Sequence, residues 1–255
     1  MFASITSVAR VGVTPCPVRV EAHIGSGRNR FSIVGLPDPA VREAKDRVRA
    51  AFAASGFTFP SRNVVVNLSP ADLPKGGTAY DLPIAIAVLA ALDERFAAAT
   101  RSVALGELAL DGKLRPVVGG LAAAVVADDL EVPCLLPRQS GDEVRLLHGR
   151  DVRVASSLSE ALEVVLRAPD SAPQPLPERV SPDAPLVDMA EIRGQRRARR
   201  ALELAAAGGH HMMMIGPPGS GKTMLAQALP GLLPDLDADD VLEVALAWAA
   251  AGLDR

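Results

Sequence analysis

The chain has 255 residues, 49% hydrophobic and 22% charged, which is material for one large domain or two ordinary ones. Its formal net charge of -3 argues against a protein that is basic overall. No apolar stretch approaches the roughly 20 residues that span a bilayer, and the N-terminus lacks a signal-peptide layout, so we expect no membrane partner and a cytoplasmic location. Cys16, Cys134 and the four histidines supply neither a disulfide framework nor a metal-ligand spacing.

The first two thirds of the chain predict an α/β or α+β domain of mixed strand order. Asp38 followed by Pro39 is typical of a helix start, and apolar residues recur at helical spacing from Val41 to Gly56. Alternating or continuous apolar runs predict the strands. The expected elements are strands at 2–13, 18–24 and 31–34, a helix at 38–56, a strand at 64–68, a helix at 81–92, a strand at 102–108, a helix at 121–127, strands at 134–136 and 152–154, and a helix at 159–166.

A proline-dense segment marks the clearest boundary. Six prolines between residues 168 and 185 exclude a helix or a central strand and favour a stiff, extended linker. We therefore expect a domain at 1–167, a linker at 168–187 and a second region at 188–255.

The second region contains a glycine-rich phosphate-binding pattern. Its fixed positions are filled between an apolar run at 211–215, expected to be one buried strand, and helix-forming residues at 224–229. A chance glycine-rich turn is the alternative, but the flanking segments favour the motif. The predicted nucleotide-binding residues are Gly216, Pro217, Pro218, Gly219, Ser220, Gly221, Lys222 and Thr223.

These residue types suit a polyphosphate. Glycines let consecutive backbone N–H groups turn inward, and the positive end of the following helix faces the same anion. Lys222 is expected to neutralise the β- and γ-phosphates, and the Thr223 hydroxyl to hold Mg²⁺. The predicted cofactors are therefore ATP and Mg²⁺.

Residues 224–255 contain no strand-like apolar run ending in Asp-Glu, which a P-loop ATPase uses to hold its metal. Four aspartates in this stretch are read as a loop and a helix start rather than as metal ligands: Asp235, Asp237, Asp239 and Asp240. We expect this chain to bind ATP without turning it over alone, and no catalytic residue is predicted.

Several segments resemble the YifB/ComM family of magnesium-chelatase-like AAA+ proteins. The resemblance covers nearly the whole chain, and it is to the N-terminal portion of the family's proteins. The segments are residues 32–38, 47–51, 66–75, 80–86, 192–195 and 200–210. The resemblance implies a ribosomal-protein-S5 domain-2-like, Lon-protease-like domain followed by the opening of an AAA+ module. It also implies a hexameric ATPase acting on branched DNA in recombination and natural transformation. Beside the nucleotide, it makes Gln195 a binding candidate, with Ile192 and Gly194.

The Lon likeness raises the alternative of a Ser-Lys protease, in which a lysine takes a proton from the nucleophilic hydroxyl. Matching the segments places Ala79 at the serine position and Ala122 at the lysine position, so both groups are missing. Thr78 is expected to end a loop, and Lys113 to lie in an exposed hairpin turn. A domain used for assembly or substrate handling is the better interpretation.

Other polar residues have structural interpretations. Asp81 is expected to be a helix N-cap whose carboxylate accepts backbone N–H hydrogen bonds. Asp72 is expected to play a similar structural role in a loop. Arg193, Arg196, Arg197 and Arg200 are spaced to form one helix face, which could contact DNA but needs no such partner. His210 and His211, adjacent at a strand start, make a poor ligand pair. The second function kept open is a non-enzymatic partner-binding module with a vestigial P-loop.

Overall fold

The computed structural model describes residues 1–27, 29–140, 151–166, 187–234 and 236–251. Its contacts divide the chain into two compact units, residues 1–176 together with 241–255, and residues 177–240. Apart from Val187, the predicted linker lies outside the described residues, and the domain boundaries stay a prediction. No helix in the described part of the chain is long and apolar enough to cross a membrane.

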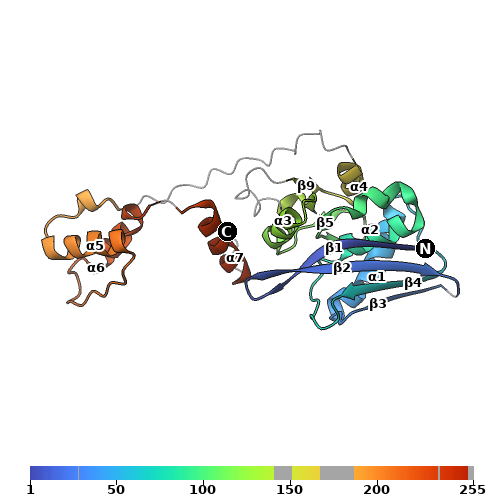
Figure 1. Ribbon diagram of the computed structural model, residues 1–255, viewed down its shortest axis with the longest axis horizontal. Helices are drawn as coiled ribbons and strands as arrows, with labels where there is room; N and C mark the ends of the chain where they lie inside the picture. The colour runs from blue at the N-terminus through green and yellow to red at the C-terminus, as the bar shows by residue number, and fades with distance from the viewer. Residues whose placement is uncertain (28, 141–150, 167–186, 235, 252–255) are drawn as a thin grey trace. The chain divides into compact units, whose positions relative to one another are not determined.

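The first unit is built on a seven-stranded mixed sheet of order β3-β4-β2-β1-β5-β8-β9 (Figure 1). β1 and β2 form an antiparallel hairpin and β2 continues antiparallel to β4, whereas the other neighbours are parallel. The strands are β1 (Phe2–Val11), β2 (Thr14–Gly25), β3 (Arg30–Val34), β4 (Asn63–Ser69), β5 (Val103–Ala104), β8 (Cys134–Pro137) and β9 (Val152–Ala155). The α/β class expected from the sequence is confirmed.

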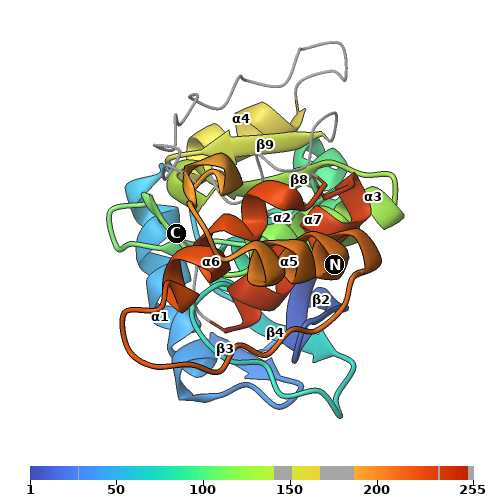
Figure 2. The ribbon, with the colours of Figure 1, turned by 90° about the vertical axis from the view of Figure 1, so that its left-hand side faces the viewer.

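Helices cover both faces of one half of this sheet. Alternate residues of β5 and β8 enter two different apolar clusters: Val103 and Cys134 lie with α3, whereas Ala104 and Leu135 lie with α2 and α4. Figure 2 shows α4 beside β9 and β8 at that edge. The helices are α1 (Pro39–Ala54), α2 (Asp81–Leu92), η1 (Glu94–Thr100), α3 (Gly120–Asp129) and α4 (Leu158–Leu166).

Helix α1 follows the sequence prediction in detail. The Asp38 carboxylate caps it by accepting the Val41 N–H at 2.7 Å, and Pro39 opens the first turn. The buried residues are those of the predicted apolar stripe: Val41, Ala44, Val48, Ala51 and Phe52. Spacing and capping together set this helix and its buried face.

The single strand expected at 102–108 is wrong, because the chain turns in the middle. Gly106 donates its N–H to the Ala79 carbonyl at 2.8 Å and accepts the Leu82 N–H at 3.0 Å. A Cβ on Gly106 would lie 3.1–3.2 Å from side-chain atoms of Leu114 and Leu82, so the close approach suits glycine. β5 therefore stops, and β6 (Glu107–Leu108) pairs with β7 (Leu114–Arg115) in a separate two-stranded sheet.

The second unit contains η3 (Met189–Glu191), α5 (Arg196–Gly208), α6 (Lys222–Ala228) and η4 (Pro230–Leu232). Met189, Ile192, Leu202, Leu225 and Ala228 form its small core. Helix α7 (Ala238–Ala250) belongs from Val241 onward to the first unit, where Leu242, Ala245 and Leu246 pack against the cluster around α3.

The buried strand expected at 211–215 is not formed. Met213 and Ile215 are 82% and 87% exposed, whereas Met212 and Met214 lie partly buried against the core. A strand requires a neighbour to pair its backbone groups, and residues 187–234 and 236–240 form no strand. His210 and His211, both exposed, therefore do not stand at a strand start.

Candidate functional site

The glycine-rich loop at 216–221 leads directly into α6, as the motif requires. Gly219 and Gly221 have φ values of +77° and +85°, in the left-handed region that favours glycine. The Gly221 carbonyl accepts the Leu225 N–H at 3.0 Å, which starts the helix. The local backbone therefore explains both glycines.

Lys222 lies within the curve of this loop. Its ammonium donates to the carbonyls of Gly216 at 2.9 Å and Pro217 at 2.8 Å, and contacts Ser220 Oγ at 3.3 Å. The loop that the motif folds around an anionic phosphate thus holds the cationic ammonium group of Lys222 here. Thr223 follows in the first turn of α6 with an exposed side chain, where its hydroxyl is accessible to a ligand.

Gln195 reaches this loop from the start of α5. Its side-chain amide nitrogen donates to the Ser220 carbonyl at 3.3 Å. Gly194 and Gln195 have φ values of +75° and +48°, so the turn before α5 is left-handed at both residues. Ile192, by contrast, is 4% exposed and packs in the core, where it supports the fold rather than contacting a ligand.

The predicted arginine face is incomplete, because Arg193 precedes α5 and does not share its face. Arg196, Arg197 and Arg200 are exposed on the helix, and Arg200 pairs with Glu203 at 2.9 Å. This arrangement fits a solvated stripe.

The predicted loop and helix start before α7 are confirmed. Asp237 accepts the Asp240 N–H at 2.9 Å, the geometry of a helix start. Asp235 and the side chain of Asp239 lie outside the described residues. Within the described residues, no group of three or more His, Cys, Asp or Glu side chains could hold a metal ion.

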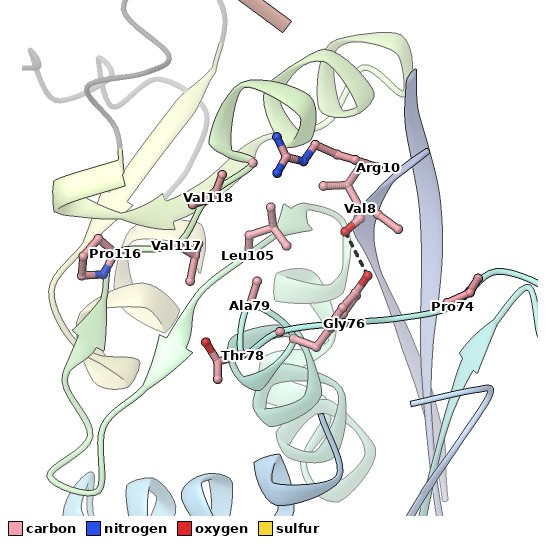
Figure 3. Close-up of a pocket in the computed structure, with 14 residues that line it drawn as sticks. Val8, Arg10, Pro74, Gly76, Thr78, Ala79, Leu105, Pro116, Val117 and Val118 are labelled. Carbon is pink, nitrogen blue, oxygen red and sulfur yellow. Dashed lines mark hydrogen bonds between the residues drawn. The ribbon is translucent and has the colours of Figure 1, made fainter. Parts of the chain in front are cut away.

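A second candidate site is a cavity of about 510 Å³ in the first unit (Figure 3). Ala79 lines it, and Ala122 is buried in α3, so neither position matched to the protease dyad carries a reactive group. Thr78, also lining it, donates its hydroxyl to the Glu107 carboxylate, whose other oxygen pairs with Arg115 at 3.2 Å. No lysine side chain activates Thr78 here.

Two lysines, Lys75 and Lys113, stand in the segments matched to the protease, and both are engaged elsewhere. Lys75 is fully buried and donates to the Pro70 carbonyl. Burial lowers the pKa of its ammonium group, and the Asp72 carboxylate opposes that shift. Lys113 is exposed and pairs with Asp111 at 3.0 Å in the predicted turn. The geometry offers no Ser-Lys chemistry.

Asp81 is not the N-cap that the sequence suggested, because Tyr80 occupies that position. Its buried carboxylate accepts two hydrogen bonds from Arg47 and one from the Leu108 N–H. Burial raises the pKa of Asp81, and the Arg47 guanidinium opposes the shift. Arg47 lies 34 residues earlier, so local spacing gave no signal for the pair.

The two free cysteines differ in burial. Cys134 is buried in the cluster around α3, and burial raises the pKa of its thiol. Cys16 is half-buried in β2.

Comparisons with known proteins show the class of protein to which this chain is similar. Residues 20–140 match the family model "Subunit ChlI of Mg-chelatase", and residues 188–255 match "Magnesium chelatase, subunit ChlI". The chain is 42% identical over 238 residues to the uncharacterized protein YifB of Escherichia coli, covering 93% of this chain and 47% of that protein. It is 38% identical over 252 residues to competence protein ComM of Haemophilus influenzae, covering 96% and 49%.

These matches make the chain a magnesium-chelatase-like protein. It belongs to the YifB/ComM family, and it spans about half the length of the relatives it matches. A shorter stretch of 77 residues, 30% of this chain and 10% of the relative, is 42% identical to an archaeal Lon protease of Halobacterium salinarum.

Proposed function

We propose that this chain binds ATP with Mg²⁺ through residues 216–223, as part of an AAA+ machine that acts on DNA. The observation that carries the proposal is the loop itself, which fills every fixed position of the phosphate-binding pattern, with Gly219 and Gly221 left-handed and Lys222 inside its curve. The membership in the YifB/ComM family supports it.

The residues present fit such a ligand. Backbone N–H groups of the loop would bind phosphate oxygens, and Lys222 would exchange its two carbonyl acceptors for them, gaining stronger charge-assisted hydrogen bonds. The Thr223 hydroxyl would be a ligand of Mg²⁺, which when bound neutralises charge on the β- and γ-phosphates. Gln195 would position the loop through the Ser220 carbonyl.

The remaining steps of ATP hydrolysis need groups that residues 224–255 do not contain, since no apolar run there ends in Asp-Glu. We therefore propose binding without turnover by this chain alone. A hexameric ring in the cytoplasm, a Lon-like first domain of the ribosomal-protein-S5 domain-2 type, and a role in recombination and natural transformation complete the proposal. The name of the competence protein ComM supports the part of this proposal that concerns natural transformation.

Calorimetry with ATP and Mg²⁺, paired with a phosphate-release assay, tests this function. The wild-type chain should bind ATP, Lys222→Ala should lose that binding, and neither should release phosphate. Lys113→Ala is the matched control, because Lys113 is exposed and pairs only locally with Asp111. Equal binding by wild type and Lys222→Ala would overturn the proposal, and turnover would overturn its statement on hydrolysis.

A second function, partner binding without catalysis, is favoured by the cavity beside Ala79. If the chain binds no ATP, this function becomes the leading one.

A further inference from the structure

The register of the β1–β2 hairpin turns part of the β1 backbone outward. Arg10 stands opposite Pro15, and Val8 stands opposite Pro17. Directly opposed residues of an antiparallel pair either exchange both backbone hydrogen bonds or neither, and proline has no N–H to donate. The N–H and C=O groups of Val8 and Arg10 therefore point away from β2.

On that side β1 has little strand pairing. β5 meets it at the single pair Thr6↔Val103, after which the chain turns away at Gly106. The Val8 carbonyl accepts the Tyr80 hydroxyl at 3.2 Å, which confirms the direction in which it points. Beyond Thr6 no other described strand lies along this edge, so it faces the cavity.

Apolar side chains form part of the cavity lining, and hydrogen bonds hold its walls. Figure 3 shows Ala79, Leu105, Val117 and Val118 around the space opposite Val8 and Arg10. One wall is fixed by the buried Ser140 hydroxyl, which accepts the Val117 N–H at 2.8 Å and donates to the Val117 carbonyl at 3.0 Å.

The opposite rim is tied to helix α1. Asp38, the cap of α1, also accepts the Gly77 N–H at 3.0 Å. With both walls fixed, the cavity of about 510 Å³ is preformed and lies within the size range of ligand sites.

The charge of the residues that line the cavity indicates which kind of ligand it would bind. Among the described residues that line the cavity, Arg10 alone carries a charge. Its guanidinium donates to the Ala249 carbonyl in the last turn of α7 at 2.6 Å. No residue of α7 lines the cavity itself. A carboxylate complements this guanidinium better than a carbonyl does.

We propose that the cavity binds an extended peptide of a partner protein, added as a strand along Val8 and Arg10. Main-chain hydrogen bonds to these two residues hold the peptide, an apolar side chain enters the cavity, and an acidic side chain pairs with Arg10. The peptide is bound and not cleaved, because Ala79 and Ala122 carry no reactive group. This inference does not depend on ATP binding by the second unit.

Fluorescence anisotropy with a fluorescein-labelled peptide, Val-Asp-Val-Ala-Val-Asp, tests the site on the whole chain. We expect the unmodified peptide to bind saturably. The same peptide methylated on alternate backbone nitrogens should bind about tenfold more weakly, because the methylated peptide has lost main-chain hydrogen-bond donors. A peptide with lysine in place of aspartate should also bind about tenfold more weakly. No binding, or equal binding of the methylated peptide, overturns the proposal.

Matched variants locate the site. Val118 and Leu110 are exposed apolar residues, 54% and 64% respectively, and only Val118 lines the cavity. Val118→Trp should weaken binding at least tenfold, whereas Leu110→Trp should change it less than twofold, with circular dichroism showing both folded. Arg10→Gln should remove the preference for aspartate over lysine. Equal affinities of the two tryptophan variants for the peptide would overturn the proposal. Displacement of the labelled peptide by single-stranded DNA, but not by the unlabelled peptide, would overturn it as well.

Discussion

Arg47 and Asp81 form a two-point ion pair, with Nε 2.6 Å from Oδ2 and Nη2 3.0 Å from Oδ1. The pair joins α1 to the first turn of α2. Asp81 also accepts the Leu108 N–H at 3.1 Å, so one buried carboxylate connects two helices and β6. A charge in such a position depends on its partner, because its hydration is lost on folding.

Replacing Asp81 with alanine should therefore lower the free energy of unfolding by about 3 kcal/mol or more, because Arg47 loses its partner. Urea denaturation measures the change. Glu43→Ala is the matched control: Glu43 approaches the same guanidinium at 3.7 Å but its side chain is 74% exposed. Its removal should cost less than about 0.5 kcal/mol, and equal losses in the two variants would contradict this account.

The buried Lys75 should make stability depend on pH. Burial lowers its pKa below the ordinary lysine value of 10.5, so the unfolded chain binds more protons between those two values. Stability contributed by Lys75 is reduced where its ammonium is charged and rises as pH increases through that window. The free energy of unfolding of wild type, relative to Lys75→Met, should thus increase from neutral pH toward 10.5.

The control for that measurement is Lys113→Met, since the Lys113 side chain is 74% exposed. The increase measured for Lys75→Met is compared with the change measured for Lys113→Met over the same pH range. Equal changes in the two variants would show that the buried ammonium of Lys75 does not titrate differently in the folded and unfolded states.

The sequence predicted elements whose causes are local. Helix α1 could be placed because its cap and its apolar spacing lie within a few residues of each other. The partner of Asp81 could not, because Arg47 meets it only after the chain folds. The turn at Gly106 likewise depends on the close approach of Leu82 and Leu114.

The same contrast separates the two candidate sites. Residues 216–223 are consecutive, so the loop could be recognised from spacing, whereas the contact of Gln195 with Ser220 spans 25 residues. The cavity is assembled from four separated segments and has no local signature. The resemblance to the Lon segment singled out Thr78 and Ala79, which line the cavity, but it did not predict the other walls. The spacing of Pro15 and Pro17 marks a strand edge only when the register with β1 is known.

The final prediction isolates loop conformation from side-chain chemistry. Gly221 has a φ of +85° and a Cβ there would meet nothing within 4 Å, so Gly221→Ala strains the backbone without a clash. ATP binding should weaken at least about tenfold, because a strain of about 1.4 kcal/mol is sufficient for that change. Gly231→Ala is the matched control, since Gly231 is equally open and has no positive φ. Calorimetry should give it wild-type affinity within about twofold. Equal affinities of the two alanine variants would mean that the left-handed turn at Gly221 does not shape the phosphate site.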